Sequence, residues 1–153
     1  MRRITAALAV TLMAGTAVAD DRADAVATAQ AFVDGFNKGD VKASLATCAS
    51  PSSVVDEFPP YAWQGPTGCA DWAGDFDANA KKEGITPGDV TLSKPRHAFV
   101  SGDRAYLVFP AKYNYTQKGK KVTQKDATMT VALQKQAGAW KITGWAWATG
   151  KSK

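Results

Sequence analysis

The sequence predicts an α+β fold in which helices come first and an antiparallel sheet follows. In the first half of the chain, apolar residues recur at helical spacing, and glycine or a capping residue marks the ends of these stretches. From residue 85 onward the apolar period changes to two, and turns that contain glycine separate the alternating runs. Helices that cover one face of an antiparallel sheet make an α+β domain.

Residues 1–19 have the pattern of a secretory signal peptide. The basic start MRR is followed by an apolar run that ends in Ala17-Val18-Ala19, an A-x-A cleavage site. Threonine and glycine interrupt this run, which is too short for the ~20-residue apolar span of a membrane helix. We predict cleavage after Ala19 and export, to the periplasm of a Gram-negative-type cell or to the outside. Residues 20–153 then form a single domain of 134 residues (153 minus 19), with no other predicted membrane span.

The composition argues against several classes of partner. The net charge of +5 falls to +3 when Arg2 and Arg3 leave with the leader, and the lysines are spread along the chain. Nucleic-acid binders concentrate basic residues on one face, so we expect no nucleic-acid partner. Two cysteines and one histidine are a poor ligand set for zinc, and no glycine-rich nucleotide motif is present. We therefore expect neither a metal nor a cofactor.

The two cysteines fit an exported protein. An even pair in an oxidising compartment favours a disulfide between Cys48 and Cys69. Two separate buried thiols are the alternative.

Three helices are expected. The first covers residues 24–37, and the second follows an N-cap at Asp40, with Cys48 on its apolar face and Pro51 at its end. Thr67 is the expected cap of the third helix, which Gly84 terminates. Its buried stripe is predicted to contain Cys69, Trp72, Ala73, Phe76 and Ala80.

The strands follow a regular order. A short strand is expected at residues 52–57. From residue 85 onward we expect a meander of about four antiparallel strands, with alternation at Val90 and Leu92, a break at Pro95, and strands at residues 96–100, 105–116, 121–134 and 139–149. In the last strand, simple alternation places Trp140 on one face and Trp145 and Trp147 on the other. A bulge at Gly144 would change that register. Large apolar groups on both faces of the sheet favour a homodimer that covers the outer face.

Several segments, taken in order, resemble the nuclear-transport-factor-2-like superfamily, which includes SnoaL-type polyketide cyclases and ketosteroid isomerases. They are FVDGFNKGDVKASL at residues 32–45, a turn at Gly65 before a helix with Trp72, and AGAWKI at residues 137–142. The resemblance covers almost the whole chain after the leader. It implies a cone, in which a curved antiparallel sheet wraps around three N-terminal helices, with a pocket at the wide end. It also implies dimers formed through the outer face of the sheet.

The stretch VVDEFPPYAWQG, residues 54–65, contains the main candidate for a functional group. Pro59-Pro60 stiffens the loop, and Asp56 stands beside aromatic residues that would raise the pKa of its carboxyl, so that it could act as a general base. A solvent-facing strand end is the alternative. His97, the only histidine, is the second candidate base, although lone strand histidines commonly lie on the surface. The residues expected at the pocket are Asp56, Tyr61, Trp63, Trp72, Phe76, Phe109, Tyr113 and Trp145.

These features predict an exported small-molecule-binding protein whose aromatic-lined pocket holds a small apolar or aromatic ligand. One alternative is a SnoaL-type isomerase, cyclase or hydrolase-like enzyme with Asp56 or His97 as general base. Another is a periplasmic protein-interaction module that uses an aromatic face of the sheet. The catalytic patterns of the superfamily's well-known enzymes have no residue-by-residue match in this chain, so the sequence leaves the question of catalysis open.

Overall fold

The computed structural model describes residues 14–152, so most of the predicted signal peptide lies outside the described part of the chain. Three helices precede most of the sheet: α1 (Ala14–Asn37), α2 (Val41–Ala46) and α3 (Gly68–Glu83). The strands are β1 (Cys48–Val55), β2 (Ala62–Gly65), β3 (Ile85–Leu92), β4 (His97–Ser101), β5 (Arg104–Gln117), β6 (Lys120–Gln136), β7 (Ala139–Ala148) and β8 (Lys151–Ser152).

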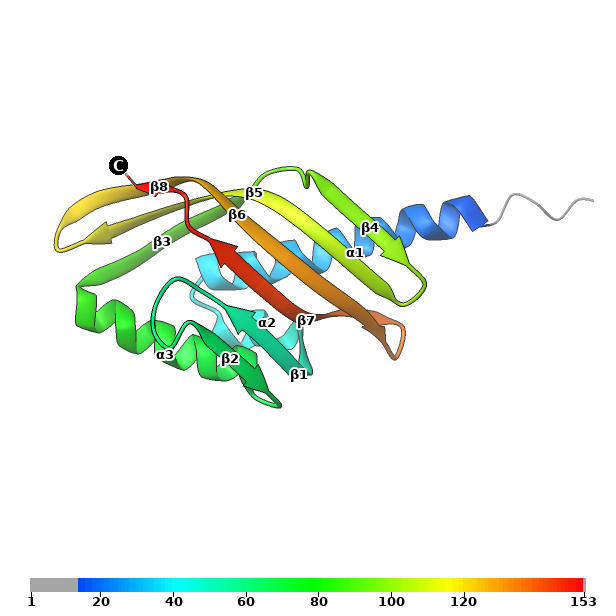
Figure 1. Cartoon of the computed structure of the whole chain (residues 1–153), viewed down its shortest axis with the longest axis horizontal. Helices are drawn as coiled ribbons and strands as arrows, with labels where there is room; N and C mark the ends of the chain where they lie inside the picture. Colours follow the sequence, from blue (N-terminus) through cyan, green and yellow to red (C-terminus); the bar gives the residue numbers. More distant parts are fainter. Residues whose placement is uncertain (1–13, 153) are drawn as a thin grey trace, which may run out of the picture.

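The strands form one curved sheet in the order β2-β1-β7-β6-β5-β3, with β4 also paired to β5 and β8 to β6. All of these pairings are antiparallel except the one between β1 and β7. The sheet curves over α1, while α3 lies beside β1 and β2 (Figure 1). This arrangement confirms the predicted α+β cone. None of the described helices is long and apolar enough to cross a membrane.

The ends of the helices follow the expected capping rules in part. The Asp40 side chain accepts a hydrogen bond from the Ala43 backbone N–H at 2.9 Å, which begins α2 as predicted. Gly84 ends α3 in the left-handed conformation, with φ of 65°. Thr67 occupies the N-cap position of α3, but its hydroxyl donates to Asp71 at 2.7 Å and caps no backbone N–H.

The second helix is shorter than predicted, and Cys48 and Pro51 belong to β1 instead. The chain leaves α2 at Ala46 because the next residues pair with β7: the Ile142 N–H donates to the Thr47 carbonyl at 2.9 Å. Parallel pairing with a strand almost a hundred residues away overrides the local helical pattern. The disulfide between Cys48 and Cys69 is confirmed, and it joins the start of β1 to the first turn of α3.

A bulge in β7 decides where its tryptophans point. Leu133 pairs with Ile142, but its neighbour Ala132 pairs with Gly144, so Thr143 is the extra residue. Trp145 is therefore buried on the same face as Ile142, so of the two alternatives the bulge beside Gly144 is confirmed and simple alternation does not hold. The inward-facing residues of β5, β6 and β7 pack on α1 to form the core. Its most deeply buried large side chains include Leu107, Phe109, Val131, Leu133 and Ile142.

Candidate functional site

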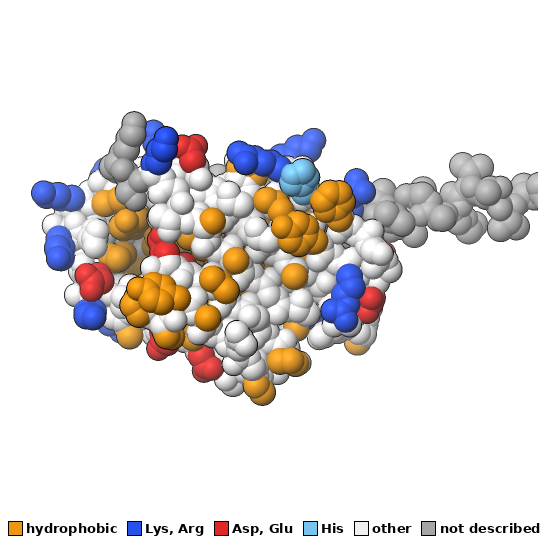
Figure 2. All heavy atoms as spheres, in the orientation of Figure 1, with side chains coloured by type: hydrophobic (Ala, Val, Ile, Leu, Met, Phe, Trp, Pro, Cys, Tyr) orange, Lys and Arg blue, Asp and Glu red, His pale blue; other side chains and the backbone are white. Residues whose placement is uncertain are grey.

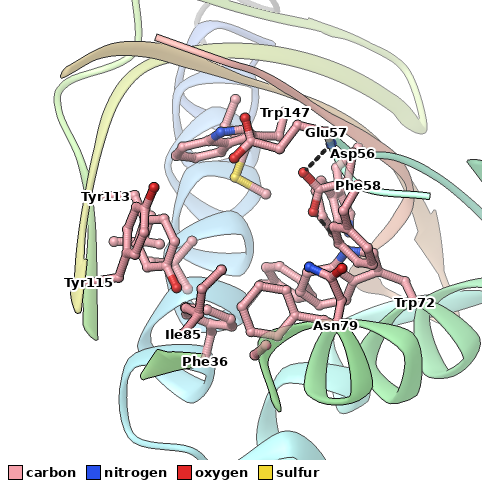
Figure 3. A pocket seen from close by; sticks show the side chains of 17 residues that line it. Phe36, Asp56, Glu57, Phe58, Trp72, Asn79, Ile85, Tyr113, Tyr115 and Trp147 are labelled. Atoms are coloured by element: carbon pink, nitrogen blue, oxygen red, sulfur yellow. Dashed lines mark hydrogen bonds between the residues drawn. The ribbon is translucent and has the colours of Figure 1, made fainter. Parts of the chain in front are cut away.

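A cavity of about 120 Å³ lies between α1, α3 and the inner face of the sheet. Residues from both helices, from the loop after β1 and from β3, β5, β6 and β7 contribute to it, and Figure 3 shows their side chains around a central space. Most of the wall is apolar. The lining residues are Phe32, Val33, Phe36, Asp56, Glu57, Phe58, Trp72, Phe76, Asn79, Ala80, Ile85, Val90, Tyr113, Tyr115, Met129, Trp145 and Trp147.

Aromatic rings form two opposite walls of the cavity. On one side, the Trp72 ring lies 4.7 Å from Trp145, edge to face, and 5.5 Å from Phe76. On the other side, Tyr113 and Tyr115 stack with ring centroids 4.8 Å apart. The two tyrosines face Trp72 across the cavity (Figure 3). Tilted and edge-to-face contacts of this kind add stability beyond area burial and hold the rings in place.

Asp56 follows β1 directly and brings a carboxylate to the aromatic wall. One carboxylate oxygen accepts the Trp72 indole N–H at 2.8 Å, and the other accepts the Glu57 backbone N–H at 2.7 Å. Burial raises the pKa of this carboxyl to about 6, and the nearby Glu57 carboxylate adds to the increase, whereas the two hydrogen bonds oppose it. Asp56 is therefore suited to exchange a proton near neutral pH.

Glu57 brings a second carboxylate to the cavity, and a buried amide holds it. The side-chain N–H of Gln124 donates to both oxygens of Glu57 at 3.0 Å, and the Thr149 hydroxyl donates to one of them. Gln124 is only 2% exposed, and its carbonyl accepts the Trp147 indole N–H at 2.7 Å. This chain of hydrogen bonds ties the loop after β1 to β6 and β7.

Tyr113 supplies a buried hydroxyl without a hydrogen-bond partner. The residue is 9% exposed and lines the cavity, and the same lack of a partner holds for the Trp145 indole N–H. Burial raises the pKa of the Tyr113 phenol far above its usual value, and Tyr115 and the two carboxylates contribute to the same increase, whereas the nearby Gly88 backbone opposes it, although its geometry falls short of a hydrogen bond. The phenol is therefore neutral and keeps a proton to donate. A buried, unpaired polar group at a cavity wall is a natural contact for a bound molecule.

Five of the predicted pocket residues line the cavity: Asp56, Trp72, Phe76, Tyr113 and Trp145. Three others lie elsewhere. Tyr61 is 56% exposed in the turn before β2, and Phe109 lies in the core at 1% exposure. Trp63 is buried behind Phe58 because it pairs with Val54, and its indole N–H donates to Asp75 at 2.8 Å.

His97, the second candidate base, is not part of the cavity. It begins β4, is exposed, and stacks on Phe99 with ring centroids 5.7 Å apart. Figure 2 shows this histidine on the surface beside large hydrophobic side chains. The structure therefore brings Asp56, and not His97, to the aromatic cavity.

Gln124 was not predicted from the sequence, and Glu57 was not predicted to line the pocket. Glu57 and Asp56 are adjacent carboxylates after the same strand, so the sequence does not show that each has its own role in the pocket. Gln124 looks like an ordinary polar residue of a strand, and its partner Glu57 is 67 positions away. No local pattern reveals such a contact. In the described part of the chain, no group of three or more metal-ligating side chains is present.

The chain matches no known family model, and no curated protein matches it. Solved structures do match. A hexachlorocyclohexane dehydrochlorinase, LinA type 3 from Novosphingobium barchaimii, aligns with a TM-score of 0.72 at 15% identity, covering 88% of this chain and 90% of that one. A ketosteroid isomerase-like protein from Erwinia carotovora aligns with a TM-score of 0.67 at 20% identity, covering 85% and 96%.

An NTF2-like protein of unknown function from Pseudomonas putida aligns with a TM-score of 0.61 at 15% identity, covering 89% of this chain and 88% of that one. At such low identities these likenesses establish the fold and leave the activity open. The chain therefore has the fold of the nuclear-transport-factor-2-like superfamily.

Proposed function

We propose that the protein binds a small, largely apolar molecule in the aromatic cavity. The observation that carries this proposal is the combination of ring-lined walls with a few polar groups, the Asp56 carboxylate and the unpaired Tyr113 hydroxyl. Ligand sites typically have this composition: an apolar lining supplies affinity, and a few polar atoms fix the orientation of the ligand. The tilted contacts among the wall residues leave the rings in a preformed arrangement.

The size of the cavity limits the buried part of the ligand. An apolar cavity of ~150 Å³ holds one benzene molecule. The volume of about 120 Å³ therefore suits one ring or a short branched chain. A larger ligand would leave part of its structure outside the cavity.

Tryptophan fluorescence offers a direct test with benzyl alcohol as a neutral one-ring probe. Three of the five tryptophans, Trp72, Trp145 and Trp147, line the cavity, so a bound molecule should change the emission. The substitution Asn79→Phe should fill the cavity and abolish the saturable signal, because Asn79 lines it from α3. Ala78→Phe is the matched control on the same helix, at an exposed position outside the lining. A saturable signal that survives Asn79→Phe unchanged would contradict the proposal.

Catalysis is the second candidate function, because Asp56 has a pKa near 6 inside an apolar cavity. A base with such a pKa can remove a proton from a bound substrate, and the neutral Tyr113 phenol can donate a hydrogen bond to an oxygen that gains charge. Asp56→Asn should abolish turnover of a substrate while the cavity still binds benzyl alcohol. Turnover that survives Asp56→Asn would exclude this role.

The proposal includes export. The N-terminal pattern that ends at Ala19 supports it, and so does the disulfide, since such bonds persist in oxidising compartments. The mass of the intact protein from the exported fraction tests the cleavage site. A chain that begins at Asp20 is expected, and a full-length chain would contradict the proposal.

We also propose a homodimer through the outer face of the sheet. Phe99 and Tyr106 pair across β4 and β5 on this face and are 61% and 46% exposed. Figure 2 shows large hydrophobic side chains at the surface beside the histidine. Apolar groups gathered on one exposed face favour a contact surface there. A different exported protein as the partner is the alternative use of the same face.

A further inference from the structure

The cavity carries negative charge that no cation of the described chain compensates. Asp56 and Glu57 both line it, whereas no lysine, arginine or histidine does. The ion pairs among the described residues join Asp77 to Lys81, Asp103 to Arg104 and Asp21 to Lys135, and none involves Asp56 or Glu57. The protein as a whole is basic, with a net charge of +5, so the acidic cavity is a local exception.

Neutral donors hold both carboxylates in place. Asp56 accepts hydrogen bonds from the Trp72 indole and from a backbone amide, and Glu57 accepts them from the Gln124 amide and the Thr149 hydroxyl. Such donors orient a carboxylate but leave its formal charge in place. The charge is then available to a ligand, and at the partly buried Asp56 the attraction is stronger than at an open surface.

The aromatic walls favour the same kind of ligand. A cation is attracted to the face of a tryptophan, tyrosine or phenylalanine ring, and clusters of such rings bind ammonium groups. Nine of the residues that line this cavity are aromatic. The unpaired hydroxyl of Tyr113 adds an oxygen that can accept an N–H from the ligand.

We infer that the cavity binds an organic amine in its protonated form: a one-ring or short-chain apolar body with an ammonium group that contacts Asp56 and Glu57. The inference rests on the proposed binding function and names its ligand class. The ring of the ligand lies among Phe36, Phe76 and the tyrosines, and its ammonium group lies at the carboxylate side of the cavity, where Figure 3 shows Asp56 and Glu57 on neighbouring walls.

Three probes with the same ring and different charges test this inference on the unmodified protein. Benzylamine is protonated at neutral pH, benzyl alcohol is its neutral counterpart, and benzoate is negative. We expect benzylamine to bind at least about tenfold more tightly than benzyl alcohol, and benzoate to be rejected. Calorimetry or tryptophan fluorescence gives the three dissociation constants under the same salt conditions.

Variants without the carboxylate charges show whether Asp56 and Glu57 cause the preference for benzylamine. Glu57→Gln and Asp56→Asn should each reduce the affinity for benzylamine by about tenfold, a clearly larger loss than the same variants cause for benzyl alcohol. Asp77→Asn is the matched control, since it makes the same charge change at an exposed site on α3. If a variant fails to fold, the comparison of the probes on the unmodified protein still decides the question.

The outcomes separate the inference from the function on which it rests. Equal affinities for benzylamine and benzyl alcohol would overturn the amine inference and leave the binding function intact. Absence of binding by all three probes would overturn the binding function itself. A preference for benzylamine that survives Glu57→Gln and Asp56→Asn equally would also overturn the inference, because another surface would then hold the cation.

Discussion

The raised pKa of Asp56 predicts that this residue makes the folded protein less stable as the pH rises. The pKa of the Asp56 carboxyl is about 6 in the folded protein, compared with the value of 3.8 for an aspartate that is free in water, as in the unfolded chain. Between these two values the folded protein holds a proton that the unfolded chain has released. Stability therefore falls as the pH increases through this window, and the contribution is fully lost above the folded pKa.

The magnitude follows from the size of the shift. A difference of about 2.2 pKa units (6 minus 3.8) corresponds to about 3 kcal/mol, at ~1.4 kcal/mol for each unit. Asp56→Asn removes the titrating group and keeps its shape. The free energy of unfolding of the wild type, relative to Asp56→Asn, should therefore drop by about 2.5 kcal/mol from about pH 4 to about pH 7.5, because a small part of the ~3 kcal/mol is already lost at about pH 4. If the substitution also weakens the hydrogen bond to Trp72, that loss of stability is the same at every pH and does not affect the change with pH.

Urea unfolding across this pH range measures the difference directly. Asp77→Asn corrects for the general effect of removing one negative charge at an exposed position. A difference between the wild type and Asp56→Asn that stays flat from about pH 4 to about pH 7.5 would refute the reasoning, because a buried carboxyl with this pKa must change stability with pH. Such a result would place Asp56 in water, at the strand end.

Three further predictions concern the disulfide, the buried amide and the outer face. Replacing Cys48 and Cys69 by serine should lower the free energy of unfolding by about 3 kcal/mol, since the bridge closes a loop with a sequence separation of 21. Thermal unfolding without reductant measures the change, and an unchanged midpoint would contradict the prediction. Gln124→Leu leaves the Glu57 carboxylate without its amide donor and should cost about 2–3 kcal/mol in urea unfolding, whereas a neutral effect would show that the hydrogen bond contributes little. Tyr106→Lys should convert the proposed homodimer to a monomer by light scattering, and a dimer that persists would place the interface elsewhere.

Elements with a strong local signal could be predicted from the sequence. The stripe of α3 is periodic, Asp40 and Gly84 are good caps, and the turns of the meander contain glycine, so the corresponding elements lie near their predicted positions. The sequence predicted Cys48 at the end of the second helix, but Cys48 begins β1 because it pairs in parallel with Ile142. That contact joins residues far apart in the chain, and the local helical pattern does not contain it.

Some residues of the candidate site could also be predicted from the sequence, and others could not. Asp56 could be identified because a carboxylate next to several aromatic residues is unusual in a short stretch of sequence. His97 could not be judged, since only the register of β4 against β5 shows that it faces outward. The direction of Trp145 depends on a single extra residue in β7, and alternation rules fail wherever a bulge shifts the register. Residues that meet only through such long-range pairings are visible in the structure alone.

The energetic cost of Asp56 gives an independent reason to assign the cavity a function. A domain of this size has a total stability of about 5–15 kcal/mol, and a penalty of about 3 kcal/mol at neutral pH is a large share of it. An asparagine at the same position could accept the Trp72 hydrogen bond without this penalty. A bound ammonium group would remove much of the penalty, because an adjacent positive charge favours the ionised carboxylate and lowers its pKa. Binding of benzylamine should therefore stabilise the wild type more at about pH 7.5 than at about pH 4, and this gain should be smaller in Asp56→Asn, where Glu57 alone still carries a carboxylate.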